Sequence, residues 1–195
     1  MKSSRGGIGV SKPNRDGTNT YTYQDYLTWE GPERWELIDG IPYLMTSPLP
    51  SHQQILLALA SAFHAFFQNR PCTPYIAPLD LTFEASEDTK KVVQPDLFVM
   101  CGEYGREKRI IGVPTLVVEI LSPSTAKHDL IRKLNLYQKA GVKEYWIVDP
   151  EEQTINVYLH DGMGFHLMES EYKAGDTLCA TVFPELEIDV REVFW

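Results

Sequence analysis

The chain has 195 residues, a length typical of one domain whose core is large enough to need no disulfide. Its composition, 43% hydrophobic and 23% charged, is that of an ordinary globular protein. The formal net charge of −9 argues against a protein that binds nucleic acid through an extended basic surface. Any such binding is expected to depend on local basic clusters and on a divalent metal that offsets the carboxylates.

The cysteines and the hydropathy pattern predict a cytoplasmic protein without a membrane span. Cys72, Cys101 and Cys179 are odd in number and widely separated, which favours reduced thiols over a disulfide framework or a zinc site. Residues 1–20 lack the apolar run of a signal peptide, and the longest apolar stretch, 55–63, is too short to cross a bilayer. We expect 1–20 to be a flexible tail and 21–195 to form a single domain.

The first half of the domain predicts a helix, a hairpin, a longer helix and an extended segment. Thr22 and Asp25 have the spacing of a capping box, and Asp39-Gly40 is typical of a hairpin turn. Ser51 is the expected N-cap of the longer helix, whose apolar residues recur at helical spacing. The expected elements are a helix over 23–29, strands over 34–38 and 41–45, a helix over 52–68 and an extended segment over 75–83.

The second half predicts a strand–helix–strand crossover followed by a hairpin. The turn at 122–125 leads into a helix that ends at Gly141, and Asp161-Gly162 joins two further strands. A crossover over 115–149 places two strands parallel to each other. The fold class is therefore α/β or α+β, with one mixed sheet. The expected strands cover 92–100, 116–121, 144–148, 154–159 and 165–168.

Three carboxylates occupy positions where apolar residues are expected. Glu119 lies inside the apolar run 116–121, Asp96 follows Pro95 at the start of another strand, and Glu36 lies inside 34–38. A buried carboxylate costs free energy unless it is paired or binds a metal. Carboxylates from three strands can converge on one hard cation.

A lysine on the following helix completes the candidate site. Asp129, Lys133 and Tyr137 are spaced by four residues and so share one helix face. A lysine near a metal-bound water can orient that water for attack on a phosphodiester. Gln94 could add a hydrogen bond.

Each residue also has an ordinary explanation. Glu119 could pair with a basic side chain, Asp96 could open a strand from a turn, and Glu36 could belong to a solvated face. Asp129 and Lys133 alone would be a common surface ion pair. Only the combination favours a site.

That combination resembles a known family. Gln94-Pro95-Asp96 followed by the stretch 116–125 is similar to the PD-(D/E)XK pattern of restriction-endonuclease-like proteins. More narrowly, the chain resembles the Uma2 (DUF820) family of endonucleases over about residues 21–195. The stretches that carry this narrower resemblance are 35–40, 129–134, 137–142 and 144–150.

The resemblance implies a mixed central sheet flanked by helices and a metal-dependent endonuclease that hydrolyses DNA. It implies Mg²⁺ or Mn²⁺ bound by Asp96, Glu119 and the carbonyl of Ile120, with Glu36 as a further acid nearby. The motif places its lysine two residues after the second acid, where this chain has Leu121. Related members take the lysine from the next helix, where Lys133 is the matching position. A non-catalytic descendant, acting as a binding or assembly module, is the alternative that Leu121 and the acidic charge favour.

Several surface features complete the prediction. His52 is expected to be a surface residue at a helix start, and His64 to be partly buried. Exposed aromatic residues at Trp146, at Tyr158 and at 194–195 point to self-association, with a homodimer as the commonest outcome. The basic residues expected to hold a DNA backbone are Lys90, Lys91, Arg106, Lys108, Arg109, Lys127, His128, Arg132 and Lys133. The chain has no serine-hydrolase elbow, Walker A run or H-E-x-x-H motif.

Overall fold

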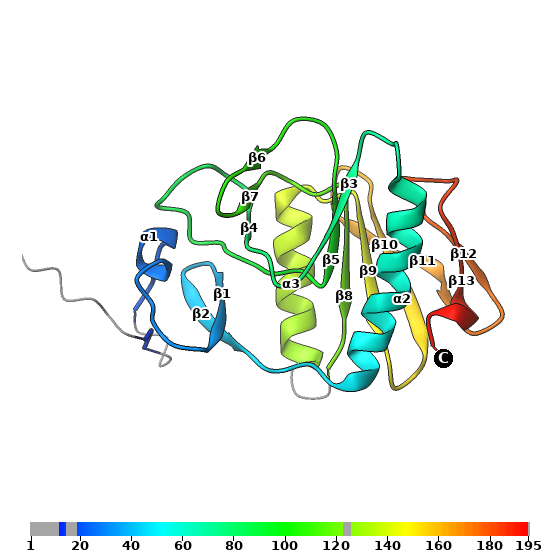
Figure 1. The fold of residues 1–195 in the computed structure, drawn as a ribbon, viewed down its shortest axis with the longest axis horizontal. Coiled ribbons are helices and arrows are strands. Elements are labelled where there is room, and N and C mark those ends of the chain that lie inside the picture. The colour runs from blue at the N-terminus through cyan, green and yellow to red at the C-terminus, as the bar shows by residue number, and fades with distance from the viewer. Residues whose placement is uncertain (1–11, 15–18, 123–125, 195) are drawn as a thin grey trace, which may run out of the picture.

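The computed structural model describes residues 12–14, 19–122 and 126–194. Most of the predicted tail, and most of the turn at 122–125, therefore lie outside the described residues. The secondary structure is a mixed α+β arrangement in which two long helices flank a central sheet (Figure 1). The fold class predicted from the sequence is confirmed.

The central sheet has six strands in the order β11-β10-β9-β8-β5-β3. β8 and β9 are parallel, whereas the other neighbouring pairs are antiparallel. The predicted crossover is thus confirmed, with α3 connecting the two parallel strands. The strands are β3 (Thr73–Ile76), β5 (Leu97–Met100), β8 (Leu116–Ile120), β9 (Glu144–Asp149), β10 (Thr154–His160) and β11 (Phe165–Tyr172).

The sheet lies between α2 (Pro50–Phe67) and α3 (Ala126–Ala140), which cover opposite faces. Successive residues of a strand point to opposite faces, so β8 contributes to both halves of the core. Leu116 and Val118 pack in the cluster that contains Leu59 of α2, while Val117 packs in the cluster that contains Leu136 of α3. Because both faces of β8 and β9 are covered, their sequences are almost continuously apolar.

Smaller elements surround this three-layer core. α1 (Tyr23–Tyr26) and the hairpin of β1 (Arg34–Ile38) and β2 (Ile41–Met45) lie beyond α3, on the side opposite α2 (Figure 1). The capping box of Thr22 with Asp25 and the hairpin turn at 39–40 are confirmed. The remaining elements are β4 (Leu81–Thr82), β6 (Gly105–Arg106), β7 (Ile110–Ile111), β12 (Thr177–Cys179), β13 (Glu187–Asp189) and a 3-10 helix (Val190–Glu192).

Several predicted boundaries are wrong. Ser51 is not the N-cap of α2, since the helix begins at Pro50 after Leu49, and proline is favoured at the first helical position. The strand predicted over 92–100 is shorter, because Val92 and Val93 form isolated bridges to Leu37 and Leu81 before β5 begins. The bridge of Leu37 to Val92 joins the β1 hairpin to the segment that precedes Asp96, and the bridge of Leu81 to Val93 joins β4 to it.

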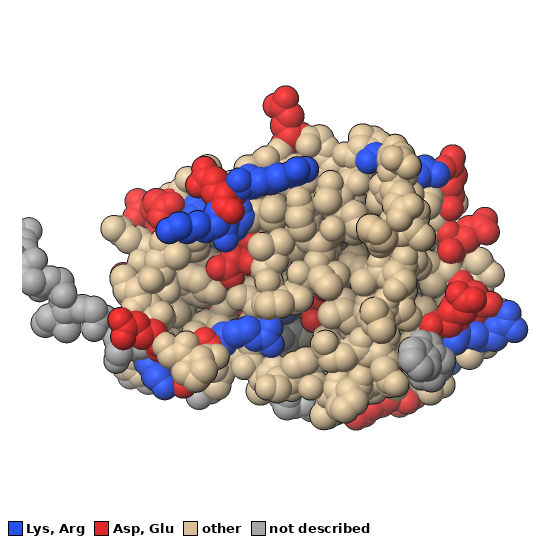
Figure 2. Space-filling view, viewed as in Figure 1, with Lys and Arg blue, Asp and Glu red and all other residues tan. Residues whose placement is uncertain are grey.

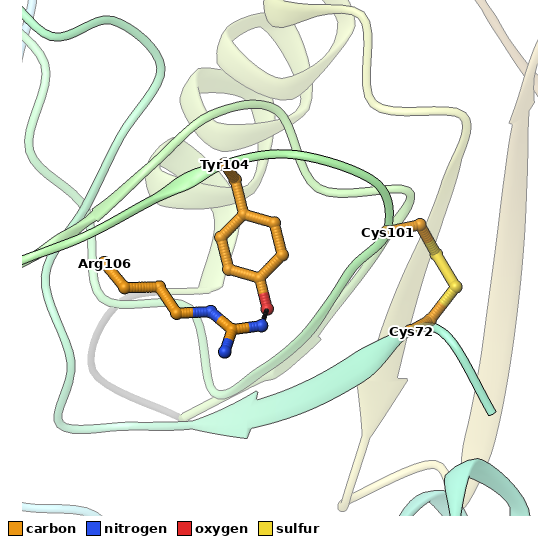
Figure 3. Close-up of a disulfide and its surroundings, with 4 residues drawn as sticks. All are labelled: Cys72, Cys101, Tyr104 and Arg106. Atoms are coloured by element: carbon orange, nitrogen blue, oxygen red, sulfur yellow. Dashed lines mark hydrogen bonds between the residues drawn. A yellow bond between two sulfur atoms is a disulfide. The ribbon is translucent and has the colours of Figure 1, made fainter. Parts of the chain in front are cut away.

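The prediction of reduced thiols is wrong for two of the three cysteines. Cys72 and Cys101 form a disulfide, with their Cα atoms 4.4 Å apart (Figure 3). They lie at one end of the antiparallel pair β3–β5, next to the partners Thr73 and Met100. Sequence separation does not reveal such cross-strand neighbours, because a sheet brings together residues that are distant along the chain.

Trp146 was predicted to be exposed, and the structure contradicts this. It is fully buried in β9, and its Nε1 donates to Glu144 at 2.7 Å. Tyr158 and Phe194 are half-buried, so the described aromatic residues expected at a self-association surface are all at least partly covered.

Among the described residues, no helix is long and apolar enough to cross a membrane.

Candidate active site

The site forms where one side chain of α3 meets two strands. Lys133 projects from α3 to Glu119 of β8 and Glu36 of β1. Its Nζ lies 3.1 Å from both Glu119 carboxylate oxygens and 3.1 Å from Oε1 of Glu36. Three residues that are far apart in the sequence therefore form one charged cluster.

Burial makes the charges in this cluster interdependent. The exposed side-chain fractions are 4% for Glu36, 9% for Glu119 and 8% for Lys133. Burial raises the pKa of Glu119 to about 8; Lys133 lowers it, whereas Asp96 and Glu36 raise it further. Once Glu119 is ionised, the carboxylates that share one lysine carry excess negative charge, which a cation would offset.

Tyr137 holds Glu119 from the same helix face. Its hydroxyl donates to Oε1 of Glu119 at 2.6 Å. Burial raises the pKa of Tyr137 well above its ordinary value, so the phenol stays protonated and acts as a donor. The predicted shared face of α3 thus brings Lys133 and Tyr137 to one carboxylate. Asp129, the third residue predicted on this face, has a side chain outside the described residues.

Asp96 lies beside the backbone that follows Glu119. Its Oδ2 accepts a hydrogen bond from the backbone N–H of Ile120 at 2.8 Å. This contact follows from the pairing of β5 with β8, in which Leu97 opposes Val118. The structure therefore places Asp96 next to the two residues that the family resemblance implies as its co-ligands.

Gln94 contributes to the site through its backbone. Its N–H donates to Oε1 of Glu36 at 2.9 Å, whereas its side-chain Nε2 donates to Asp80 at 2.8 Å. The side-chain amide also contacts Tyr26, with Nε2 3.4 Å from the hydroxyl. The amide of Gln94 thus bonds to a neighbouring polar cluster rather than to Asp96 or Glu119.

His52 was predicted to lie on the surface, and the structure contradicts this. It is 7% exposed, and its Nε2 lies 3.2 Å from Oδ2 of Asp96. The sequence did contain a signal, since His52, Ile55 and Leu59 recur at helical spacing on one face. His64, predicted to be partly buried, is exposed instead.

Two ordinary explanations considered for single residues are also wrong. Glu36 does not belong to a solvated face, because it is 3% exposed and paired with Lys133. Lys133 is not part of an exposed ion pair, because it is buried between Glu36 and Glu119.

A pocket opens next to His52 and Leu121. It lies between the start of α2 and the carboxyl ends of the parallel strands β8 and β9, where open α/β sheets commonly bind ligands. Leu121, which occupies the position of the motif lysine, lines this pocket together with His52. The other lining residues are Leu49, Ser51, Ser122, Asp149, Pro150 and Glu151.

The basic residues expected to hold DNA are partly engaged elsewhere. Arg109 is 5% exposed and donates to Thr82 at 3.0 Å, so it is not available to a ligand. Arg106 bonds to Tyr104 (Figure 3), and the guanidinium of Arg132 lies over the ring of Tyr43. On the face shown in Figure 2, Lys and Arg occur in small patches, most of them beside acidic residues, with no continuous basic surface among the described residues.

The donor atoms of the site suit a hard divalent cation. No group of three His, Cys, Asp or Glu side chains in the described part of the chain is placed to hold a metal. Mg²⁺ needs no such group, because it is commonly held by one or two carboxylates and keeps several waters. Asp96 and Glu119, with the carbonyl of Ile120, are the residues that could hold such an ion, since Asp96 lies against the Ile120 peptide unit and interacts electrostatically with Glu119.

A mixed sheet between two helices, with an acidic cluster and a lysine at the crossover, agrees with the restriction-endonuclease-like core that the resemblance implies. The chain matches the Uma2 family model, described as "Putative restriction endonuclease", over residues 23–191, and it belongs to this family. It is also 31% identical to an uncharacterized protein of Synechocystis sp. over 159 residues, which is 80% of this chain and 82% of that protein.

A solved structure has the same fold. It is a crystal structure from Anabaena variabilis described as a "putative nuclease belonging to DUF820". The TM-score is 0.72 at 22% identity, over 89% of this chain and 97% of that one. At this identity the likeness shows the shared fold, which agrees with the family predicted from the sequence.

Proposed function

We propose that this protein is a metal-dependent endonuclease that hydrolyses phosphodiester bonds of DNA. The observation that carries the proposal is the contact of the buried Lys133 amine with Glu119 and Glu36, beside Asp96. The description of the Uma2 family and that of the Anabaena relative support a nuclease.

The cofactor in this proposal is Mg²⁺ or Mn²⁺, held by Asp96, Glu119 and the carbonyl oxygen of Ile120. Such a cation, when bound, supplies Lewis acidity toward the phosphate and lowers the pKa of its water. The Ile120 N–H bonds to Asp96, which places that carboxylate next to the Ile120 peptide unit.

Lys133 performs two tasks in the proposed reaction. Its ammonium group can orient a water for attack on phosphorus, and its charge stabilises the negative charge that develops on the phosphoryl oxygens. Glu36 and Glu119 hold the ammonium in place through contacts of 3.1 Å each. Tyr137 in turn fixes Glu119, so the amine approaches the site from a rigid helix face.

A non-catalytic binding or assembly module is the second candidate function. Two observations favour it. Arg109 and Arg106 are bonded to other residues of the protein, and the chain has a net charge of −9. Such a protein would keep the nuclease fold without binding a DNA backbone tightly. A homodimer stays a prediction. Trp146 does not support it, because this residue is fully buried.

A cleavage assay separates these functions. Supercoiled, linear, single-stranded and branched DNA are incubated with the protein and Mg²⁺ or Mn²⁺, with EDTA as a control. Asp96→Asn and Lys133→Met should each lower the rate by at least about 100-fold. Lys139→Met, an exposed lysine on the same helix, is the matched control and should cut like the wild type.

The outcomes are distinct. Cleavage that needs both the metal and Asp96 supports the endonuclease. Cleavage that survives EDTA and Asp96→Asn contradicts the proposed site. Absence of cleavage on all four DNA forms, together with absence of Mn²⁺ binding in calorimetry, favours the binding module.

A further inference from the structure

A backbone N–H and a ring nitrogen from different elements lie close to one oxygen of Asp96. The backbone N–H of Ile120 approaches Oδ2 at 2.8 Å from β8, and His52 Nε2 approaches it at 3.2 Å from the first turn of α2. Both distances lie within the usual range for N–H···O hydrogen bonds. Two nitrogen atoms close to Oδ2 restrict the rotation of the Asp96 carboxylate.

The ring of His52 is itself held in place. The imidazole is buried on the apolar face of α2, where its neighbours Ile55 and Leu59 pack in the core. The side-chain Nε2 of Gln53 lies 3.5 Å from Nδ1 of His52. Nε2 is therefore the ring nitrogen that faces Asp96, and in the tautomer that carries its proton there it can donate to the carboxylate.

Packing alone does not explain a histidine at this position. A buried polar ring costs free energy unless it has a partner, and an aliphatic side chain would fill the same place without that cost. The described partner of the ring nitrogen Nε2 is Asp96, whose side chain is 15% exposed. The arrangement has the geometry of an outer partner that orients a metal-binding carboxylate.

We propose that His52 is a positioning residue for the metal site, whose Nε2–H holds Asp96 in its metal-binding orientation. This inference rests on the proposed function, since it requires that Asp96 binds a divalent cation. His52 acts through Asp96 and takes no part in the proton transfers of the reaction. Loss of an outer partner of this kind typically weakens metal affinity by 10- to 100-fold.

The test measures Mn²⁺ binding by titration calorimetry on the full chain, with circular dichroism melting as the check on folding. His52→Ala should raise the Mn²⁺ dissociation constant by about 10- to 100-fold, because it removes the donor. His52→Gln places an amide donor at a similar reach and should restore affinity to within about threefold of the wild type. Gln54→Ala, an exposed neighbour in the same turn, is the matched control and should bind like the wild type.

Asp96→Asn separates the inference from the function on which it rests. If the wild type binds Mn²⁺, Asp96→Asn abolishes binding and His52→Ala binds normally, the role of His52 is refuted and the metal site stands. If His52→Gln folds but binds as weakly as His52→Ala, the donated hydrogen bond is not the cause. A wild type that binds no Mn²⁺ overturns both proposals. If His52→Ala does not fold, restored affinity in His52→Gln supports the inference, and weak binding overturns it.

Discussion

Replacement of Lys133 by methionine tests the electrostatic core of the site. Methionine keeps most of the side-chain volume but removes the ammonium group, which lies 3.1 Å from three carboxylate oxygens. Both acidic partners are at least nine-tenths buried, so water cannot replace the lost charge. Two buried carboxylates would then face each other without a counter-charge.

The expected loss in the free energy of unfolding is large relative to the total stability of a domain. Removal of one partner of a buried ion pair costs about 3–5 kcal/mol, and a domain has only about 5–15 kcal/mol in total. The loss should be greater at pH 9, which is above the pKa of about 8 that Glu119 has in the presence of Lys133. It should be smaller at pH 6, because Glu119 then carries a proton and no longer needs a counter-charge.

Urea unfolding in EDTA, followed by circular dichroism, measures this difference. Lys139→Met is the control, since that lysine is exposed and its loss should cost no more than about 0.5 kcal/mol. The double variant Lys133→Met/Glu36→Gln should recover at least about 1 kcal/mol at pH 9 by removing one unpaired charge. Equal stability of Lys133→Met and Lys139→Met at pH 9 would refute the reasoning.

Three further predictions concern stability in the absence of metal. Because folding raises the pKa of Glu119, the free energy of unfolding of the wild type should fall as pH rises from about 4.5 to about 8. Urea unfolding at several pH values should show that Glu119→Gln lacks this part of the pH dependence. Tyr137→Phe should cost about 1.5–3 kcal/mol at pH 9, because the bond to Glu119 is buried, and a loss below 0.5 kcal/mol would contradict this. Reduction by dithiothreitol should destabilise the wild type by about 3–4 kcal/mol, because it opens the disulfide. The stability of the double variant Cys72→Ser/Cys101→Ser should not change with dithiothreitol, and thermal melts of both proteins measure the difference.

The residues of the site were predictable to different degrees. Glu119 is identifiable because a charged residue in an otherwise apolar run must find a partner. Lys133 and Tyr137 are identifiable because helical spacing puts them on one face. By contrast, the alternation of polar and apolar residues around Glu36 is also typical of a solvated strand, so its burial depends on which element covers the β1 hairpin.

The sequence by itself determined the main helices and strands and their order. Hydrophobic periodicity, the capping box at Thr22 and the turns at Asp39-Gly40 and Gly141 are local signals, and each appears in the structure. The continuous apolar strands on both sides of α3 likewise specified the parallel crossover. These features depend on residues within a few positions of one another, so the chain alone encodes them.

Only the tertiary structure decided which distant residues meet. The pairing of Cys72 with Cys101 depends on the register of β3 with β5, and the burial of Trp146 depends on helices that cover both faces of the sheet. The contact of His52 with Asp96 depends on how the start of α2 packs against the edge where β5 begins. Such contacts join segments far apart in the chain, and no local pattern records the packing that brings them together.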